Sequence, residues 1–145
     1  MDAFDAVSVD SSPELLARKF FTVAEANKAL PLVQRIVADI VRDYSRLLSL
    51  REECQSHDAR GNPVEAEFAR QQYVAVADRL SELNEELEKI GCELKDYQMG
   101  LVDFPGMKDG REVCLCWKLG EEAVEYWHDV AAGFPGREAI PSDMH

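Results

Sequence analysis

Two long stretches of the chain carry apolar residues in a heptad pattern. In the first, the intervals alternate between four and three residues at Ala26, Leu30, Val33, Val37, Ile40, Tyr44 and Leu47. In the second, the same alternation runs through Ala66, Ala69, Tyr73, Val76, Leu80, Leu83, Leu87 and Ile90. Such spacing brings one side chain per turn to the same face of a helix. The pattern therefore predicts two long helices that a short connection folds into an antiparallel hairpin.

The first predicted helix covers residues 22–55. Thr22 is a suitable N-cap, and Glu25 stands three residues later, where it completes a capping box. Pro31 falls inside the pattern and lacks a backbone N–H, so the sequence predicts either a kink near Leu30 or a fresh helix start at Pro31.

The second predicted helix covers residues 62–90. Asn62 is a favourable N-cap, Pro63 suits the first helical position, and Glu65 completes a box-like spacing. Gly91 supplies a C-terminal stop, because glycine adopts the left-handed conformation that ends many helices.

The first helix has more apolar surface than a single seam requires. The additional positions are Leu32, Ile36, Val41 and Leu48. A helix with so wide an apolar stripe packs on more than one neighbour. These four residues are therefore a candidate interface, covered by the C-terminal part of the chain, by a second copy in a homodimer, or by another partner protein.

The pattern changes to an alternation of polar and apolar residues after Gly91. Within 111–118, Val113, Leu115 and Trp117 face one way, while Cys114 and Cys116 face the other. The run LVDFP, ended by Pro105, and the stretch 123–129 are further strand candidates, and KDG at 108–110 is a turn signal. We predict an α+β fold in which residues 92–140 form a small antiparallel sheet on the hairpin, with 18–21 as a short strand that pairs with it.

The domain organisation follows from these elements. Residues 18–140 form one α+β domain, residues 1–17 read as a mobile acidic tail, and residues 141–145 read as a second tail. The 145-residue length is ordinary for one domain with a real core.

The net charge of the chain makes some classes of binding partner unfavourable. The formal charge is −12, from 28 acidic and 16 basic residues. Such a charge disfavours nucleic acid and anionic membrane surfaces, which both require cations. The N-terminus lacks the basic and apolar regions of a secretory signal, so we expect a cytoplasmic protein whose four cysteines are reduced.

The C-terminal third contains most of the chemically interesting side chains. Cys114 and Cys116 share a strand face, and a hairpin could bring one of them opposite His128, which makes these three the candidate metal ligands. Small buried thiols and a hydrogen-bonded structural histidine explain the same residues without a metal. His128 and Asp129 point to opposite sides of a strand, so both cannot chelate one ion unless the strand bends.

A ligand site is the other interpretation of this region. The arginines at 111 and 137 could grip an anion, or one of them could pair with Asp103 and pin the sheet. The aromatic residues could fill a core or line a pocket. The candidate ligand-binding residues are Asp103, Arg111, Cys116, Trp117, Tyr126, Trp127, His128, Asp129 and Arg137.

Four segments resemble a bacterial family filed as domain of unknown function 2203. They are FTVAEANKALPLV at 21–33, GLVDFP at 100–105, GREVCLCWKLGE at 110–121 and EYWHDVAAGFPGREAI at 125–140. The resemblance covers residues 20–140 and implies a small, soluble bacterial protein. It brings no activity, cofactor or catalytic residue.

Two functional hypotheses remain open at this point. The first is a helical-hairpin module that self-associates or binds another protein. The second is a small-molecule or metal-binding domain with its site on the C-terminal sheet, with or without enzymatic activity. None of the familiar phosphate-binding, dinucleotide-binding or serine-hydrolase motifs occurs in the chain.

Overall fold

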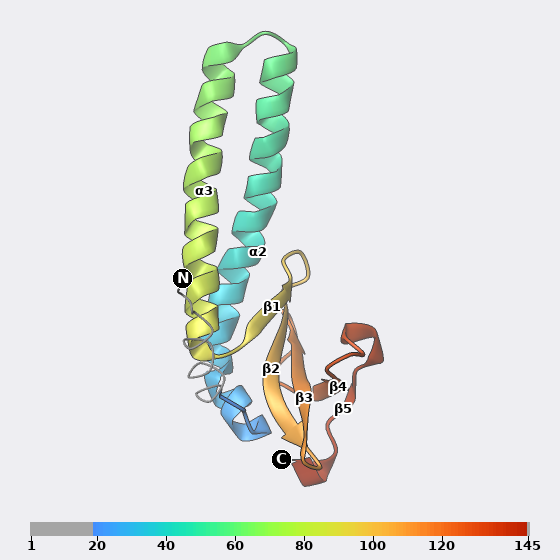
Figure 1. Cartoon of the computed structure of the whole chain (residues 1–145). Coiled ribbons are helices and arrows are strands. Elements are labelled where there is room, and N and C mark those ends of the chain that lie inside the picture. The colour runs from blue at the N-terminus through green and yellow to red at the C-terminus, as the bar shows by residue number, and fades with distance from the viewer. Residues whose placement is uncertain (1–18, 145) are drawn as a thin grey trace, which may run out of the picture.

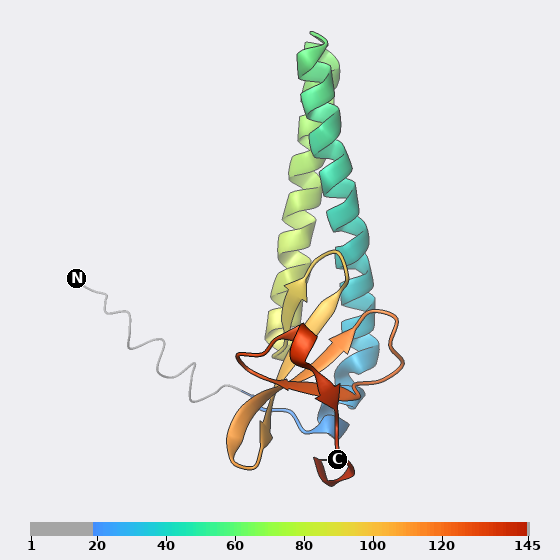
Figure 2. The ribbon, with the colours of Figure 1, turned by 90° about the vertical axis from the view of Figure 1, so that its right-hand side faces the viewer.

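The computed structural model describes residues 19–144, and its fold is α+β, as the sequence predicts. Two long helices form an antiparallel hairpin, and a sheet lies beside the lower half of that hairpin (Figure 1). Helix α2 spans Val23–Ala59 and helix α3 spans Pro63–Ile90. The far half of the hairpin, including its tip, extends beyond the sheet, so among residues 19–144 the two helices have only each other as neighbours there (Figures 1 and 2). The predicted tail 1–17 lies outside the described residues.

The start of α2 agrees with the predicted capping box. The Glu25 N–H donates to Thr22 Oγ1 at 3.1 Å, and the Thr22 N–H donates to Glu25 Oε1 at 2.9 Å. The predicted fresh start at Pro31 is wrong, because α2 continues through this residue. Pro31 is exposed, so its ring points away from the core while the apolar face of the helix stays packed.

The hairpin connection is tighter than predicted, because α2 continues to Ala59 rather than ending near residue 55. Gly61 takes a positive φ of 71° in the turn. Asn62 stands at the N-cap of α3, but its side chain makes no capping hydrogen bond, contrary to expectation. Gly91 ends α3 with a φ of 110°, which confirms the predicted stop.

The sheet is an antiparallel meander of five strands. The strands are β1 (Glu93–Asp96), β2 (Leu101–Lys108), β3 (Arg111–Lys118), β4 (Tyr126–Asp129) and β5 (Glu138–Ala139), and they lie side by side in chain order. The predicted turn at 108–110 joins β2 to β3, with positive φ at both Asp109 and Gly110. Short 3₁₀ helices follow at Phe134–Gly136 and Ser142–Met144.

Strand β2 passes through Pro105, where the sequence predicts an end. The Pro105 carbonyl accepts a 2.7 Å hydrogen bond from the Phe21 N–H, so this residue's backbone groups point away from β3. The first β1–β2 pair is Glu93 with Asp103, so β1 does not reach Pro105. Proline therefore costs no ladder hydrogen bond here. The Phe21 ring also packs against the Phe104 ring of β2, with 5.1 Å between the ring centroids, but residues 19–22 are not a strand.

One face of the sheet packs against α2 and α3. Its buried side chains alternate along the strands and join the helix seam in a single core; they are Val102, Phe104, Val113, Leu115, Trp117 and Trp127. The loop before β4 is fixed to α2 by one side chain. Asn27 Oδ1 accepts from the Val124 N–H at 2.7 Å, and Asn27 Nδ2 donates to the Val124 carbonyl at 3.3 Å.

The predicted interface stripe does not form a continuous exposed surface. Ile36 is buried in the core, which excludes it from an external interface. Val41 and Leu48 are half-buried, and Val41 packs beside Gly100 at the base of β2. Only Leu32, at 45% exposure, is open to solvent. The sheet therefore supplies much of the cover that the wide stripe requires.

Candidate metal centre

Three side chains from three strands meet on the face of the sheet that is turned away from the helices. They are Asp103 of β2, Cys114 of β3 and His128 of β4. One oxygen, one sulfur and one nitrogen atom from these residues all lie within 4.8 Å of one another. Alternation along the strands places them opposite the core residues Phe104, Leu115 and Trp127.

Strand register explains how the cluster forms. Cys114 is paired directly with His128, and Asp103 is paired with Cys116. Strand β3 separates β2 from β4, so the Asp103 and His128 side chains meet over β3. His128 Nε2 lies 3.0 Å from Asp103 Oδ1. Both residues are buried, whereas Cys114 is half-buried.

The second ring nitrogen of His128 fixes its orientation. His128 Nδ1 lies 2.8 Å from the backbone carbonyl oxygen of Asp129, which can only accept a hydrogen bond. Nδ1 must therefore carry the proton. In the neutral ring, this leaves the lone pair of Nε2 directed at Asp103 Oδ1. Metal-bound histidines are typically oriented in this way, with the far N–H donated to a carbonyl or carboxylate.

The geometry does not support a nucleophilic cysteine. In a cysteine–histidine–carboxylate triad, one ring nitrogen faces the thiol and the other faces the carboxylate. Here the two nitrogens face Asp103 and the Asp129 carbonyl. The pKa of the Cys114 thiol is raised to about 12, mainly by burial and secondarily by the nearby Asp103 carboxylate. A thiol with so high a pKa is protonated at neutral pH and is a poor nucleophile.

The donor set suits a small divalent cation such as Zn²⁺. Zinc takes histidine nitrogen at about 2.0–2.1 Å, cysteine sulfur at about 2.3 Å and carboxylate oxygen at about 2.0–2.2 Å. Tetrahedral geometry then separates the ligand atoms by roughly 3.3–3.7 Å. The three atoms lie within 4.8 Å of one another, and His128 Nε2 and Asp103 Oδ1 lie 3.0 Å apart, so this pair must separate slightly for the three atoms to share one ion.

Cys116 belongs to a neighbouring group rather than to the cluster. Its thiol lies 3.9 Å from Arg137 Nη1, and Arg137 forms a two-point ion pair with Glu121. The Arg137 guanidinium also lies over the rings of Tyr126 and Phe134. The pKa of the Cys116 thiol is raised to about 11, mainly by burial and secondarily by the Asp103 carboxylate.

The expected Asp103–Arg pair is wrong. Asp103 contacts His128 instead, while Arg111 forms an exposed ion pair with Asp129 and Arg137 pairs with Glu121. Asp129 therefore does not join His128 at the cluster, in agreement with strand alternation. The structure also separates the aromatic residues: Trp117 and Trp127 lie in the core, and Tyr126 lies on the side of the cluster.

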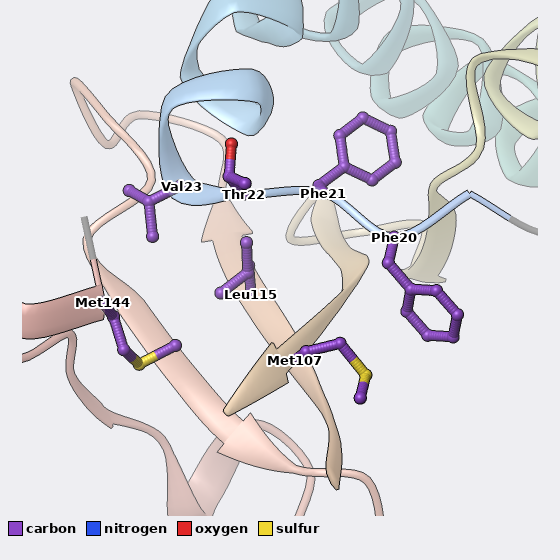
Figure 3. A pocket seen from close by; sticks show the side chains of 7 residues that line it. All are labelled: Phe20, Phe21, Thr22, Val23, Met107, Leu115 and Met144. Carbon is purple, nitrogen blue, oxygen red and sulfur yellow. The ribbon is translucent and has the colours of Figure 1, made fainter. Parts of the chain in front are cut away.

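A small apolar pocket lies on the other side of the sheet, at the base of the hairpin (Figure 3). Its volume is about 150 Å³, and its lining residues are Phe20, Phe21, Thr22, Val23, Met107, Leu115 and Met144. Leu115 faces the helices, so this pocket does not open onto Cys114. Among the lining residues, only Thr22 has a side-chain hydroxyl, so the pocket offers few groups to orient a polar ligand.

Comparison with known proteins identifies the family. A family model described as an uncharacterised conserved protein, DUF2203, matches residues 19–140. The chain belongs to this family. The family match spans both helices and all five strands, including Asp103, Cys114 and His128. No curated protein and no solved structure gives a significant match. Within residues 19–144, no helix is long and apolar enough to cross a membrane.

Sequence reasoning missed two residues near the site. Lys95 lies on β1, and its ammonium interacts electrostatically with both Asp103 and Cys114. Glu121 accepts hydrogen bonds from the Lys118 N–H and from Arg137, so it organises the loop between β3 and β4. The GEE segment of that loop reads as a turn, and only the folded register shows what Glu121 binds.

Proposed function

We propose that this protein binds one zinc ion at Asp103, Cys114 and His128. The observation that carries the proposal is the His128 ring, whose Nδ1–H is donated to the Asp129 carbonyl while Nε2 faces the Asp103 carboxylate. A carboxylate and an imidazole lone pair repel each other unless a proton or a cation lies between them. Cys114 offers a third donor of the type that zinc prefers over magnesium or calcium.

Burial supports a cation at this place. Asp103 is 6% exposed and His128 is 2% exposed, so the carboxylate has little contact with water. Bound zinc compensates a buried negative charge and keeps a thiolate deprotonated despite a high intrinsic pKa. The cysteine must be reduced to bind, and all four cysteines are free thiols, which supports the proposed cytoplasmic location.

Zinc competition tests the proposal. Reduced, metal-free protein is titrated with Zn²⁺ in the presence of a chromophoric chelator. We expect one equivalent of tight binding, and a loss of at least tenfold in affinity for Asp103→Asn, Cys114→Ser and His128→Ala, because each removes one ligand. Cys54→Ser is the matched control, since Cys54 is a partly buried thiol on α2. Weak binding by the wild type, or equal binding by all variants, refutes the site.

A second candidate function is self-association through the hairpin tip. Val64 is 76% exposed and Phe68 is 62% exposed, and they lie one turn apart on α3. They line a groove of about 530 Å³ between the helices, together with Arg46, Glu53, His57, Glu65, Ala69 and Gln72. Two hairpins that stack on this groove make a four-helix bundle, which is the natural way to cover two exposed helices. The sequence offers Leu32, Ile36, Val41 and Leu48 as an interface for a homodimer or another partner protein; self-association is proposed at the tip instead.

Sedimentation equilibrium tests this second function. We expect a concentration-dependent dimer for the wild type and a monomer for Phe68→Glu, because a charge in the groove opposes its burial. Val74→Glu is the control, since Val74 is 53% exposed on another face of the same helix. A wild type that stays monomeric over the whole concentration range excludes the dimer.

A further inference from the structure

We infer that the zinc proposed above keeps one coordination position for an external oxyanion, a carboxylate or a phosphate, and that Lys95 is the cation that attracts this ligand. The inference rests on the proposed zinc site. It identifies the chemical class of the site's partner, which neither the family nor the fold supplies.

The protein supplies three ligand atoms to the cluster. Within the described part of the chain, Asp103, Cys114 and His128 form the group. Zinc is almost always four-coordinate, and sites with three protein ligands keep the fourth position for water or substrate. Cys116 is the nearest other thiol along β3, but residues two apart on a strand are about 6.6 Å apart and Cys116 contacts Arg137.

The accessible side of the cluster is the side next to Cys114. Asp103 and His128 are buried, whereas Cys114 is half-buried, so of the three ligands Cys114 has the most contact with solvent. A fourth ligand that arrives there completes the tetrahedron without moving the buried pair.

Lys95 is positioned to attract an anion to this side. It lies on β1, two residues from Glu93, which is the register partner of Asp103. The β1–β2 register is irregular between Leu94 and Asp96, so strand alternation alone does not place Lys95. Its ammonium lies beside the cluster because it pairs with Glu93 and interacts electrostatically with Asp103 and Cys114. Its pKa is raised by a hydrogen bond to Glu93, with further contributions from Asp103 and Cys114. Lysine is charged at neutral pH at its ordinary pKa of about 10.4, and this ammonium is within electrostatic range of two of the three ligands.

The present partner of Lys95 does not immobilise it. Lys95 Nζ lies 3.0 Å from Glu93 Oε1, but the two side chains are 44% and 69% exposed. Exposed ion pairs contribute little free energy, so Lys95 can turn toward a bound anion at small cost. Arg137, the cation beside Cys116, is paired with Glu121, and the side-chain exposures of the two residues are only 17% and 18%.

Cobalt substitution tests the inference with the full-length protein. Metal-free protein is loaded with one equivalent of Co²⁺, and its visible absorption is recorded during titration with acetate and, separately, with inorganic phosphate; chloride at equal ionic strength is the control. We expect a saturable spectral change with at least one oxyanion. Lys95→Gln should weaken this response about fivefold, the value of one solvent-exposed charge interaction. Lys28→Gln, which removes an exposed lysine from α2, should leave it unchanged.

The outcomes separate the two proposals. Cobalt that binds without responding to either anion, or an equal response from Lys95→Gln and wild type, overturns the oxyanion inference and leaves the metal site standing. Failure to bind cobalt at all refutes the metal site and the inference together. A stronger response to acetate than to phosphate assigns the ligand as a carboxylate, and the reverse order assigns it as a phosphate.

Discussion

His128 Nε2 and Asp103 Oδ1 lie 3.0 Å apart although their strands are not neighbours in the sheet. The two side chains meet over β3, and the Cys114 thiol of that strand lies within 4.8 Å of both. This arrangement depends on two registers at once, between β2 and β3 and between β3 and β4. A slip of one residue in either pairing moves the side chains to opposite faces and dismantles the cluster.

The buried pair predicts a large loss of stability when one partner is removed. In the metal-free protein a proton between His128 Nε2 and Asp103 Oδ1 makes the two residues a hydrogen-bonded pair, so His128→Ala leaves the Asp103 carboxylate buried without its partner and should cost about 3 kcal/mol of unfolding free energy. Arg111→Ala removes an ion pair whose side chains are 57% and 52% exposed, and it should cost less than about 1 kcal/mol. Urea denaturation at pH 7 measures both, and equal losses contradict the assigned burial.

The ion pair between Asp43 and Arg79 should make the stability of the hairpin depend on pH in the acid range. Arg79 donates to both oxygens of Asp43, at 2.7 Å and 3.0 Å, and these hydrogen bonds lower the pKa of the Asp43 carboxyl. A carboxyl with a lowered native pKa stabilises the fold above its ordinary pKa of about 3.9, and this contribution disappears as the pH falls through the native value. The stability gap between wild type and Arg79→Gln should be full at pH 7 and should close below pH 4.

The matched control for this pH dependence is Arg70→Gln. Arg70 pairs with Glu67 and Asp58 on the surface of the same hairpin, where all three side chains are about half exposed. We expect only a small stability gap for this variant at any pH. Denaturant titrations between pH 2 and pH 7 compare the two variants, and a gap for Arg79→Gln that does not change with pH counts against the assigned role of Asp43.

Gly100 is predicted to be intolerant of any side chain. Its φ is 72°, and a Cβ built there lies 2.8 Å from Leu119 Cβ and 2.9 Å from Val37 Cγ1. Gly61 has nearly the same φ, 71°, with nothing within 4 Å of a built Cβ. Gly100→Ala should therefore cost about 1–3 kcal/mol more than Gly61→Ala, because it adds overpacking to the same backbone strain. Thermal unfolding of the two variants gives the difference directly.

Pro31 predicts a stabilising substitution. It interrupts the backbone hydrogen bonding of α2 without ending the helix, and its side chain is exposed. Pro31→Ala should raise the unfolding free energy by about 1–3 kcal/mol, since it restores an N–H donor and removes the clash with the carbonyl of residue 27. A decrease in the urea midpoint would show that the proline ring has a packing role.

The sequence predicts the parts of the fold that depend on local patterns. The heptad spacing and Gly91 predict the two helices, because amphipathic periodicity and end signals act over one or two turns. The sequence prediction fails at Pro31, because burial of the apolar face of α2 stabilises the helix by more than the lost backbone hydrogen bond destabilises it. The sequence also predicts wrongly that the strand ends at Pro105. Whether the missing N–H of proline costs a ladder hydrogen bond depends on which edge of β2 is paired at that residue, and the sequence does not show this.

The candidate site is predictable only as a set of residue types. The sequence offers Cys114, Cys116 and His128 as candidate metal ligands, beside a purely structural role for the same residues, and it offers Asp103 only as a candidate for ligand binding or for an ion pair. It assigns Asp103 to an arginine, because the proximity of β2 and β4 across β3 is a non-local property. The position of Lys95 near the cluster depends on the same pairing of β1 with β2.

The most direct measurement is a crystal structure of the zinc-loaded protein with anomalous diffraction data at the zinc edge. The account predicts one strong anomalous peak, within about 2.0–2.3 Å of Asp103 oxygen, Cys114 Sγ and His128 Nε2, with Nδ1 still bonded to the Asp129 carbonyl. A zinc peak elsewhere, or no ordered zinc beside a direct His128–Asp103 hydrogen bond, would contradict it.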